Sequence, residues 1–402
     1  MVELKHVKAL SSMAQSCSGI GDCRTAYRQA LGWYGVCPMV DHTPGFEPYY
    51  ARGKMRAIRG LLEGKFEPSG SFARVMYQCT LCGACKAVCH VSGVSCITWP
   101  TSKFIDHTRL FEALRADLVE LGLGPMPRHK EILNWISREH NPYMEKHGDR
   151  LAWAGGYSLK AKGDMFFFVG CTGPYRMPEV CRDVYEVAAA AGVNLVMSPE
   201  EWCCGSIALR VGDRKLAESL ARHNLEVFEK AGARTVVTHC AGCYRTLKKD
   251  YPEILGSMPF EVIHVTELLA RLIEEGRLEL AESSLTVTYH DPCHLGRHCN
   301  VYDEPRKIVK SIPGVKLVEM KRNRDGALCC GAGGGVRSAF PELALSIARE
   351  RLSQAEETGA QVLLSACPFC ERNLSDARSY KPSTKLQVED VVSFVKRHLK
   401  RK

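Results

Sequence analysis

Ten of the twenty cysteines form two sets with matching spacing, and this duplication restricts the fold more than any other feature. In each set one cysteine precedes an adjacent pair, and a Cys-x-x-Cys motif follows. The gaps are 31 and 35 residues in the first set and 35 and 36 in the second. From Leu216 and Leu343 onward the two copies also align without a gap, so one structural unit occurs twice. The two sets are Cys171, Cys203, Cys204, Cys240 and Cys243, and Cys293, Cys329, Cys330, Cys367 and Cys370.

Strand-like and helix-like segments alternate within each copy. Short apolar runs such as "MFFFVGC" and "AQVLLSAC" end at a cysteine, and amphipathic segments such as 341–357 lie between them. Alternating strands and helices predict a parallel sheet in an α/β fold. Cysteines at strand ends then gather at the carboxyl edge of the sheet, where such folds bind ligands.

The cysteine content indicates metal binding rather than disulfides. The apolar runs are far shorter than the roughly 18–20 residues needed to span a bilayer, and no secretory signal is evident. We therefore expect a cytoplasmic protein, where thiols stay reduced, that docks on a membrane only through a partner. The formal charge of +9 leaves out metal-bound thiolates, and nothing resembles a nucleic-acid-binding module.

Five cysteines in each copy exceed the four that a zinc ion takes, and an adjacent pair reaches two metal atoms better than one. A disulfide within the pair needs a strained ring. Gly205 and Gly331 allow a tight turn with N–H groups aimed at sulfur, and the "AGGG" that includes Gly333 leaves room for a close approach. A phosphate-binding loop is the rival interpretation, but the Lys-Ser/Thr signature is missing. A polynuclear cluster is the better prediction.

The N-terminal part carries a run that is typical of cubane [4Fe-4S] clusters. The run is "CTLCGACKAVC", with His90 where proline usually follows, and a partial second run lies upstream. In two-cluster ferredoxins the fourth cysteine of each run crosses to the other cluster, so one set is Cys37 with the first three cysteines of the "CTLCGACKAVC" run. The other set consists of the last cysteine of that run and two upstream cysteines, which leaves one ligand position open. Cys96 is the candidate for this position, and a water molecule or a histidine is the alternative. The predicted ligands are Cys17, Cys23, Cys37, Cys79, Cys82, Cys85, Cys89 and Cys96.

Both copies match the CCG domain of heterodisulfide reductase catalytic subunits, and "YHDPCHLGRH", "CCGAGGG" and "ACPFC" resemble that family as well. The resemblance covers essentially the whole chain. It implies one noncubane [4Fe-4S] cluster per copy, held by the five cysteines of that copy, besides the two cubane clusters. It also implies a ferredoxin-like two-cluster domain, mainly helical, before two α/β CCG domains related by a pseudo-two-fold axis. Cys181 and Cys299 lie outside all of these sets.

The predicted domains are 1–102 for the ferredoxin-like part and 103–160 for a helical connector. The first CCG domain is then 161–282 and the second is 283–402. Arginine and lysine side chains near the cluster loops are the candidates for binding cofactor or an anionic substrate. They are Arg210, Arg245, Arg297, Arg337, Arg372 and Lys248.

The resemblance implies an enzyme that reduces the mixed disulfide of coenzyme M and coenzyme B. Electrons would come from a membrane b-type cytochrome or a soluble flavoprotein, because the sequence has no flavin motif that we identify. Three alternatives are open. One is an electron relay from a flavin-linked lactate or glycolate dehydrogenase, or from an electron-transfer flavoprotein, to a quinone. Another is a protein that reduces the trisulfide of a sulfur-carrier protein, and the third is a zinc scaffold.

Overall fold

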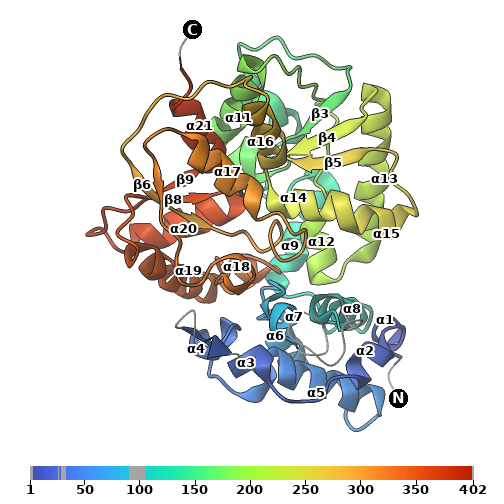
Figure 1. Ribbon diagram of the computed structural model, residues 1–402. Helices are drawn as coiled ribbons and strands as arrows, with labels where there is room; N and C mark the ends of the chain where they lie inside the picture. Colours follow the sequence, from blue (N-terminus) through green and yellow to red (C-terminus); the bar gives the residue numbers. More distant parts are fainter. Residues whose placement is uncertain (1–2, 26, 29–32, 90–104, 401–402) are drawn as a thin grey trace. The chain divides into compact units, whose positions relative to one another are not determined.

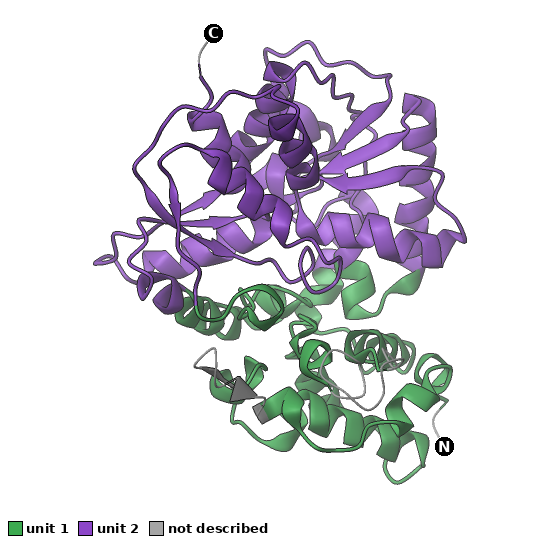
Figure 2. Ribbon diagram, viewed as in Figure 1, with its two compact units in different colours: residues 1–131, 207–214, 321–351 green, residues 132–206, 215–320, 352–402 purple. Residues whose placement is uncertain are grey.

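A computed structural model of the chain describes residues 3–25, 27–28, 33–89 and 105–400. These residues form two compact units that do not follow the order of the sequence (Figure 2). Unit 1 comprises Met1–Glu131, Ile207–Arg214 and Lys321–Arg351, and unit 2 comprises Ile132–Ser206, Lys215–Met320 and Leu352–Lys402. Segments of both repeats therefore belong to unit 1. The predicted domain borders stay a prediction.

Unit 2 contains two parallel sheets, one from each repeat (Figure 1). The strand order is β3-β4-β5 in the first sheet and β7-β6-β8-β9 in the second. In both, the strand that leads to the Cys-x-x-Cys motif is an inner strand, paired in parallel on both sides. The α/β prediction is thus confirmed. The strands are β3 (Met165–Phe168), β4 (Thr235–Thr238), β5 (Glu261–His264), β6 (Thr286–His290), β7 (Lys316–Leu317), β8 (Val362–Ser365) and β9 (Gln387–Asp390).

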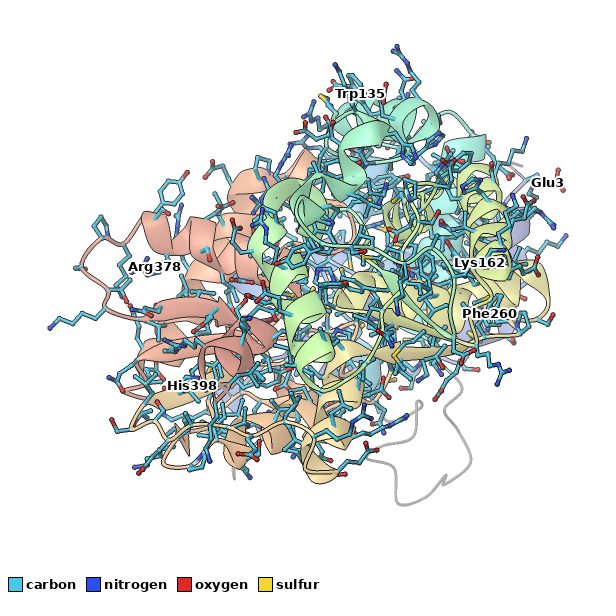
Figure 3. The ribbon with its side chains drawn as sticks, turned by 90° about the horizontal axis from the view of Figure 1, so that it is seen from above. Glu3, Trp135, Lys162, Phe260, Arg378 and His398 are labelled. Carbon is cyan, nitrogen blue, oxygen red and sulfur yellow. The ribbon has the colours of Figure 1, made fainter. Side chains whose placement is uncertain are left out.

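Aromatic side chains form the core around β3. Phe166 and Phe168 are fully buried and contact Phe228 of α13 edge to face, with ring centroids 5.1 and 5.9 Å apart. Phe260, labelled in Figure 3, packs against the same ring at 5.7 Å. A strand covered on both faces needs a continuous apolar run, which is why "MFFF" does not alternate with polar residues.

The helices of unit 2 repeat one arrangement in the two copies. α11 of the first repeat packs against α21 of the second, and α17 of the second packs against α16 of the first. α11 and α17 follow the first strand of their repeats, and α16 and α21 follow the last strand. Each pair therefore joins the same two kinds of helix with the repeats interchanged, which supports the predicted pseudo-two-fold relation. The helices are η4 (His147–Ala154), α10 (Thr172–Arg176), α11 (Pro178–Ala190), α14 (Ala241–Arg245), the π-helix η5 (Thr246–Asp250), α15 (Tyr251–Leu255), α16 (Val265–Glu274), α17 (Asp303–Ser311), α20 (Pro368–Ser379) and α21 (Val391–Arg397).

Unit 1 is mainly helical, as predicted. Asp106 caps the N-terminus of α8 by accepting hydrogen bonds from the backbone N–H groups of Thr108 and Arg109, which explains where this helix begins. The elements are α1 (Lys5–Lys8), α2 (Ser11–Gln15), α3 (Asp22–Thr25), β1 (Tyr27–Arg28), β2 (Trp33–Tyr34), α4 (Met39–His42), η2 (Glu47–Tyr49), α5 (Ala51–Leu62), α6 (Gly70–Tyr77), α7 (Ala84–Val88), α8 (His107–Glu120), η6 (Arg324–Gly326) and α18 (Val336–Ala339).

Four helices contain residues of both units. They are α9 (Pro127–Glu139), α12 (Ser206–Val211), α13 (Arg214–Ala231) and α19 (Pro341–Glu356). The predicted helix at 341–357 matches α19 to within one residue. Across the described part of the chain, no helix is both long enough and apolar enough to cross a bilayer.

Candidate metal centres

The first cysteine set comes together at the carboxyl edge of the β3-β4-β5 sheet, within unit 2. Cys171 follows β3, and Cys240 follows β4 at the N-cap position of α14. All five members have buried side chains. Hydrogen bonds join Cys171 to Cys203, Cys203 to Cys204, Cys204 to Cys243, and Cys243 to Cys240. Cys203 and Cys204 thus have different outer partners, and the prediction that adjacent cysteines reach different metal atoms stays a prediction.

This chain of sulfur contacts continues into the second repeat. Cys240 is hydrogen-bonded to Cys367, which in turn is hydrogen-bonded to Cys370 of the same motif. Both motifs stand where an inner strand passes into a helix, since Cys367 occupies the N-cap position of α20 as Cys240 occupies that of α14. The first set and the second Cys-x-x-Cys motif therefore share one buried cluster of seven sulfurs, which we call the sulfur row.

The chemistry of the sulfur row suits metal binding. Hydrogen bonds from Cys203 and Cys243 lower the pKa of Cys204 to about 6. The hydrogen bond with Cys240 and burial raise the pKa of Cys367 to about 12. Neighbouring thiols thus share protons, because several thiolates at this spacing repel one another in a medium of low polarity. Bound iron would remove that repulsion through its positive charge and would keep every ligand deprotonated.

The second cysteine set is divided between the two units. Cys293 follows β6 in unit 2 with the Cys367 motif, whereas the adjacent pair Cys329 and Cys330 belongs to unit 1. All five side chains are buried. The prediction that these five meet at one cluster stays a prediction, because each unit is described by itself.

The glycine after each cysteine pair makes the same contact in both repeats. The N–H of Gly205 points at Sγ of Cys203 over 3.5 Å, and the N–H of Gly331 points at Sγ of Cys329 over 3.4 Å. Both glycines have positive φ angles, 81° and 90°. A Cβ on Gly331 would also lie 2.3 Å from the carbonyl oxygen of Ala344 in α19. The predicted N–H to sulfur contacts are present.

A buried ion pair supports Cys171, and the sequence analysis did not find it. Nη1 of Arg150 lies 3.1 Å from Oε1 of Glu201 and 3.9 Å from Sγ of Cys171, and it also donates to the carbonyl of Gly170. The carboxylate of Glu201 accepts the N–H groups of Val169 and Gly170 at 2.9 and 2.8 Å. One charged pair thus fixes the loop between β3 and Cys171. A buried arginine before the repeat leaves no sequence signal.

The predicted arginine and lysine candidates differ in how their charge is used. Arg210 pairs with Glu112 at 2.8 Å, Arg245 lies 3.7 Å from Asp250, and Lys248 donates to the hydroxyl of Tyr244 over 2.6 Å. Their charges are therefore engaged within the protein. Arg297 follows the Cys293 loop, and Arg337 is in α18.

Arg372 is half-buried and lies beside the sulfur row. Its guanidinium stands 5.4 Å from the ring centroid of Tyr143, and Arg176 stands over the same ring at 4.6 Å. The hydroxyl of Tyr143 is hydrogen-bonded to Thr172 at 2.8 Å. Burial raises the pKa of Tyr143 to about 12, with smaller contributions that include the nearby thiolates of Cys171 and Cys240. The charge of Arg372 and the thiols of Cys171 and Cys240 thus act on the same tyrosine.

A second group of cysteines lines one cavity in unit 1. Cys37, Cys79, Cys82 and Cys85 surround it, together with Lys54. Burial and the neighbouring thiols raise the pKa of Cys37 and of Cys85. These are the four residues that the crossing rule assigns to one cubane cluster.

Lys54 is a charged residue of this cavity that the sequence analysis missed. Its side chain is 1% exposed, and Nζ donates to the carbonyls of Pro48 and Val75 at 2.7 and 3.1 Å. Burial lowers the pKa of Lys54 to about 8, and the thiolates of Cys79 and Cys37 oppose that shift. A buried ammonium group beside four thiols fits an anionic cluster.

The remaining N-terminal cysteines form a looser group. Burial raises the pKa of Cys23 to about 12, and the charges of Cys17 and Cys89 add to that shift. These three are the partners that the crossing rule predicted. His90 and Cys96 lie outside the described residues, so the fourth ligand stays a prediction. Cys181 is buried in α11 and Cys299 is half-buried.

Comparison with known proteins gives matches over almost the whole chain. Residues 165–248 and 287–375 match the family model of the cysteine-rich domain (CCG), and residues 12–93 match the 4Fe-4S dicluster domain. These matches support iron–sulfur clusters as the metal centres of the chain.

Two relatives show how far the similarity extends. The chain is 38% identical to the D-type subunit of the dihydromethanophenazine:CoB–CoM heterodisulfide reductase of Methanosarcina barkeri, over 98% of this chain and 96% of the relative. It is 32% identical to one subunit of the fumarate reductase (CoM/CoB) of Methanothermobacter marburgensis, over 85% of this chain and 65% of the relative.

Among solved structures, a hypothetical protein from Helicobacter pylori has a similar fold. The TM-score is 0.54 at 8% identity, and the match covers 100% of this chain and 78% of the other. At this identity the likeness concerns the fold alone.

Proposed function

The chain belongs to the iron–sulfur protein family of the D-type subunit of heterodisulfide reductase, and from this we propose that it reduces the mixed disulfide of coenzyme M and coenzyme B. The reaction takes two electrons and two protons and gives two thiols, one from each half of the disulfide. Iron–sulfur clusters supply the electrons one at a time when they are bound.

The sulfur row is the observation that carries this proposal. It joins the ligands of the first repeat to the Cys-x-x-Cys motif of the second through the contact of Cys240 with Cys367. A disulfide has two sulfur atoms, and two centres built from adjoining ligands would allow one centre for each sulfur. A relay that handles no substrate has no need for two complete sets of five cysteines, nor for ligands from both sets in one buried row.

The protein's own residues orient the ligands and the substrate. Arg150 and Glu201 hold the Cys171 loop, and the N–H groups of Gly205 and Gly331 point at ligand sulfur atoms. The coenzyme halves carry sulfonate, carboxylate and phosphate groups, and Arg372 provides a cation beside the sulfur row to bind such an anion. We assign the noncubane clusters to the two sets of five cysteines and the cubane clusters to the N-terminal cysteines.

The electrons come from a partner protein in this proposal. The name of the Methanosarcina relative gives dihydromethanophenazine as its electron donor. For this chain we propose either a membrane b-type cytochrome or a soluble flavoprotein as the donor. Binding to such a cytochrome would place the chain at the membrane surface.

The test is disulfide reduction by the anaerobically purified full chain, with reduced methyl viologen as electron donor. We expect turnover with the mixed disulfide, and a loss of at least about tenfold in the variant Cys240→Ser, because a ligand in the sulfur row is removed. Cys299→Ser is the matched control, since that thiol lies outside every set, and it should keep full activity. A fully iron-loaded chain without any disulfide activity would refute the proposal and favour a relay to a quinone.

A further inference from the structure

The "AGGG" segment of the second repeat lies directly on the backbone of the cubane-binding loop, within unit 1. A Cβ on Gly333 would lie 2.6 Å from the carbonyl oxygen of Thr80, and a Cβ on Gly334 would lie 2.5 Å from that of Cys79. Real Cβ contacts do not come this close, so glycine is required at both positions. The room beside these glycines is therefore occupied by the backbone of Cys79 and Thr80, and the predicted approach of another group to a cluster stays a prediction.

One buried arginine joins the two loops. Nη1 of Arg115 donates to the carbonyl of Gly334 at 2.7 Å, and Nη2 donates to the carbonyl of Cys79 at 2.7 Å. The same two nitrogens also bind the carbonyls of Arg210 and Met76, both at 2.8 Å. The guanidinium is fully buried and stacks on Tyr77 at 4.9 Å. Its charge and four hydrogen bonds hold the loops together.

The far end of the glycine segment is fixed as well. Nε2 of His129 lies 2.9 Å from the carbonyl oxygen of Gly335, which identifies it as the protonated nitrogen of the ring. A Cβ on Gly335 would lie 2.7 Å from that nitrogen. The segment is thus held on both sides, and its first glycine comes three residues after Cys330.

The two repeats differ at this point. After the cysteine pair and its glycine, the first repeat continues with "SIALRV" and the second with "AGGGVR". The first repeat reaches this region through the carbonyl of Arg210, six residues beyond Cys204, and Arg115 binds both that carbonyl and the carbonyl of Cys79. The second repeat touches Cys79 itself, four residues beyond Cys330.

We propose that the contact of Gly333 and Gly334 with Cys79 and Thr80 is the electron-transfer contact between the N-terminal centres and the second repeat, with Arg115 as its positioning residue. This inference rests on the proposed function. One electron crosses in each event: the centre held by Cys79 is oxidised, the centre held by Cys329 and Cys330 is reduced, and no proton moves. The first repeat then receives its electron from the second, on the side of Cys240 and Cys367.

The variant Gly333→Ala tests the contact in the anaerobically purified full chain. The two backbones must separate by about 1 Å to admit the new methyl group, and we expect electron transfer between them to slow severalfold, because electronic coupling falls as the separation grows. Gly70→Ala is the matched control, because Gly70 has neither a positive φ nor any atom within 4 Å of the added Cβ.

The measurement is freeze-quench electron paramagnetic resonance after mixing oxidised protein with dithionite. The signal of the second repeat is identified by its loss in Cys330→Ser, and that of the first by its loss in Cys204→Ser. We expect the N-terminal signals to form at the wild-type rate in Gly333→Ala and the second-repeat signal to form late. Their magnetic coupling should weaken, whereas Gly70→Ala should match the wild type.

Two results would overturn the inference. One is a second-repeat signal that forms at the wild-type rate in Gly333→Ala with all iron present, and the other is a wild type in which the first repeat is reduced before the second. If Gly333→Ala loses iron, the variant Arg115→Lys provides the test instead. Lysine keeps the positive charge but cannot bind all four carbonyl groups. An unchanged rate of electron transfer in Arg115→Lys refutes the proposal. A different result would refute the proposed function: the wild type would show these signals in the same order but would not reduce the disulfide.

Discussion

The substitution Arg150→Met is the sharpest test of how the first repeat holds its ligands. Arg150 and Glu201 each have a side chain only 1% exposed, and Nη1 lies 3.1 Å from Oε1. Nη2 of Arg150 also donates to the carbonyl of His140 at 2.8 Å, and that carbonyl accepts the N–H of Cys203 at 2.9 Å. Methionine keeps much of the volume of arginine but leaves the carboxylate of Glu201 buried without its cation.

The expected cost follows from that unpaired charge. Removing one partner of a buried ion pair costs about 3–5 kcal/mol, whereas the intact pair is worth little compared with apolar residues. In a compact unit the size of unit 2, each kcal/mol lowers Tm by about 2–4 °C, so Arg150→Met should lower it by about 10 °C. The double variant Arg150→Met/Glu201→Gln removes both charges and should recover much of this loss.

Thermal unfolding of the iron-loaded chain under anaerobic conditions measures these differences, with iron content determined on the same samples. Arg222→Met is a matched control, because that arginine makes an exposed i,i+4 pair with Glu218. The reasoning is refuted if Arg150→Met unfolds within about 1 °C of the wild type, or if the double variant is no more stable than the single one.

Three further outcomes are expected. Lys54→Met should make the midpoint potential of the centre held by Cys37 more negative, because the added electron loses a nearby positive charge. A tenfold change in the reduction equilibrium constant corresponds to about 59 mV for a one-electron couple, and a redox titration monitored by paramagnetic resonance measures it. Burial lowers the pKa of His129 from the ordinary 6.5 to about 4, so its contribution to stability is complete above pH 6.5 and is lost as the pH falls through 4. His129→Gln should therefore show a smaller loss of Tm between pH 7 and 4 than the wild type. Cys23→Ser should lose about four of about sixteen irons in elemental analysis, whereas an unchanged count would exclude the second cubane.

The sequence predicted the strands of the site because each ends at a cysteine. β3, β4, β6 and β8 occur where the apolar runs "MFFFVGC", "RTVVTHC", "LTVTYHDPC" and "AQVLLSAC" lie. β5 and β9 are the equivalent last strands of the two repeats. They were not predicted, because no cysteine marks their ends. Parallel pairing then brings the cysteines of the first set to one edge, so the ligand positions follow from topology and spacing together.

The charged residues around the centres could not be predicted. Lys54, Arg115 and Arg150 are almost completely buried, but each stands in a stretch that also reads as an ordinary solvated helix or loop. Their roles depend on carbonyl groups that come from distant parts of the chain, such as Gly334 for Arg115. Spacing within one segment carries no information about such partners.

The duplication gave the two repeats the same ligands but not the same supports. The first repeat has Glu201 two residues before its cysteine pair, and the second has Ala327 at that position. The second repeat instead supports its Cys293 loop through Arg306, which binds both carboxylate oxygens of Asp291 at 2.7 and 2.9 Å. The first repeat keeps "SIAL" where the second has its glycines, so only the second can lie against the backbone of Cys79. Since identical ligand sets would leave two clusters interchangeable, these differences in the supporting residues are what would give each repeat its own place in the electron path.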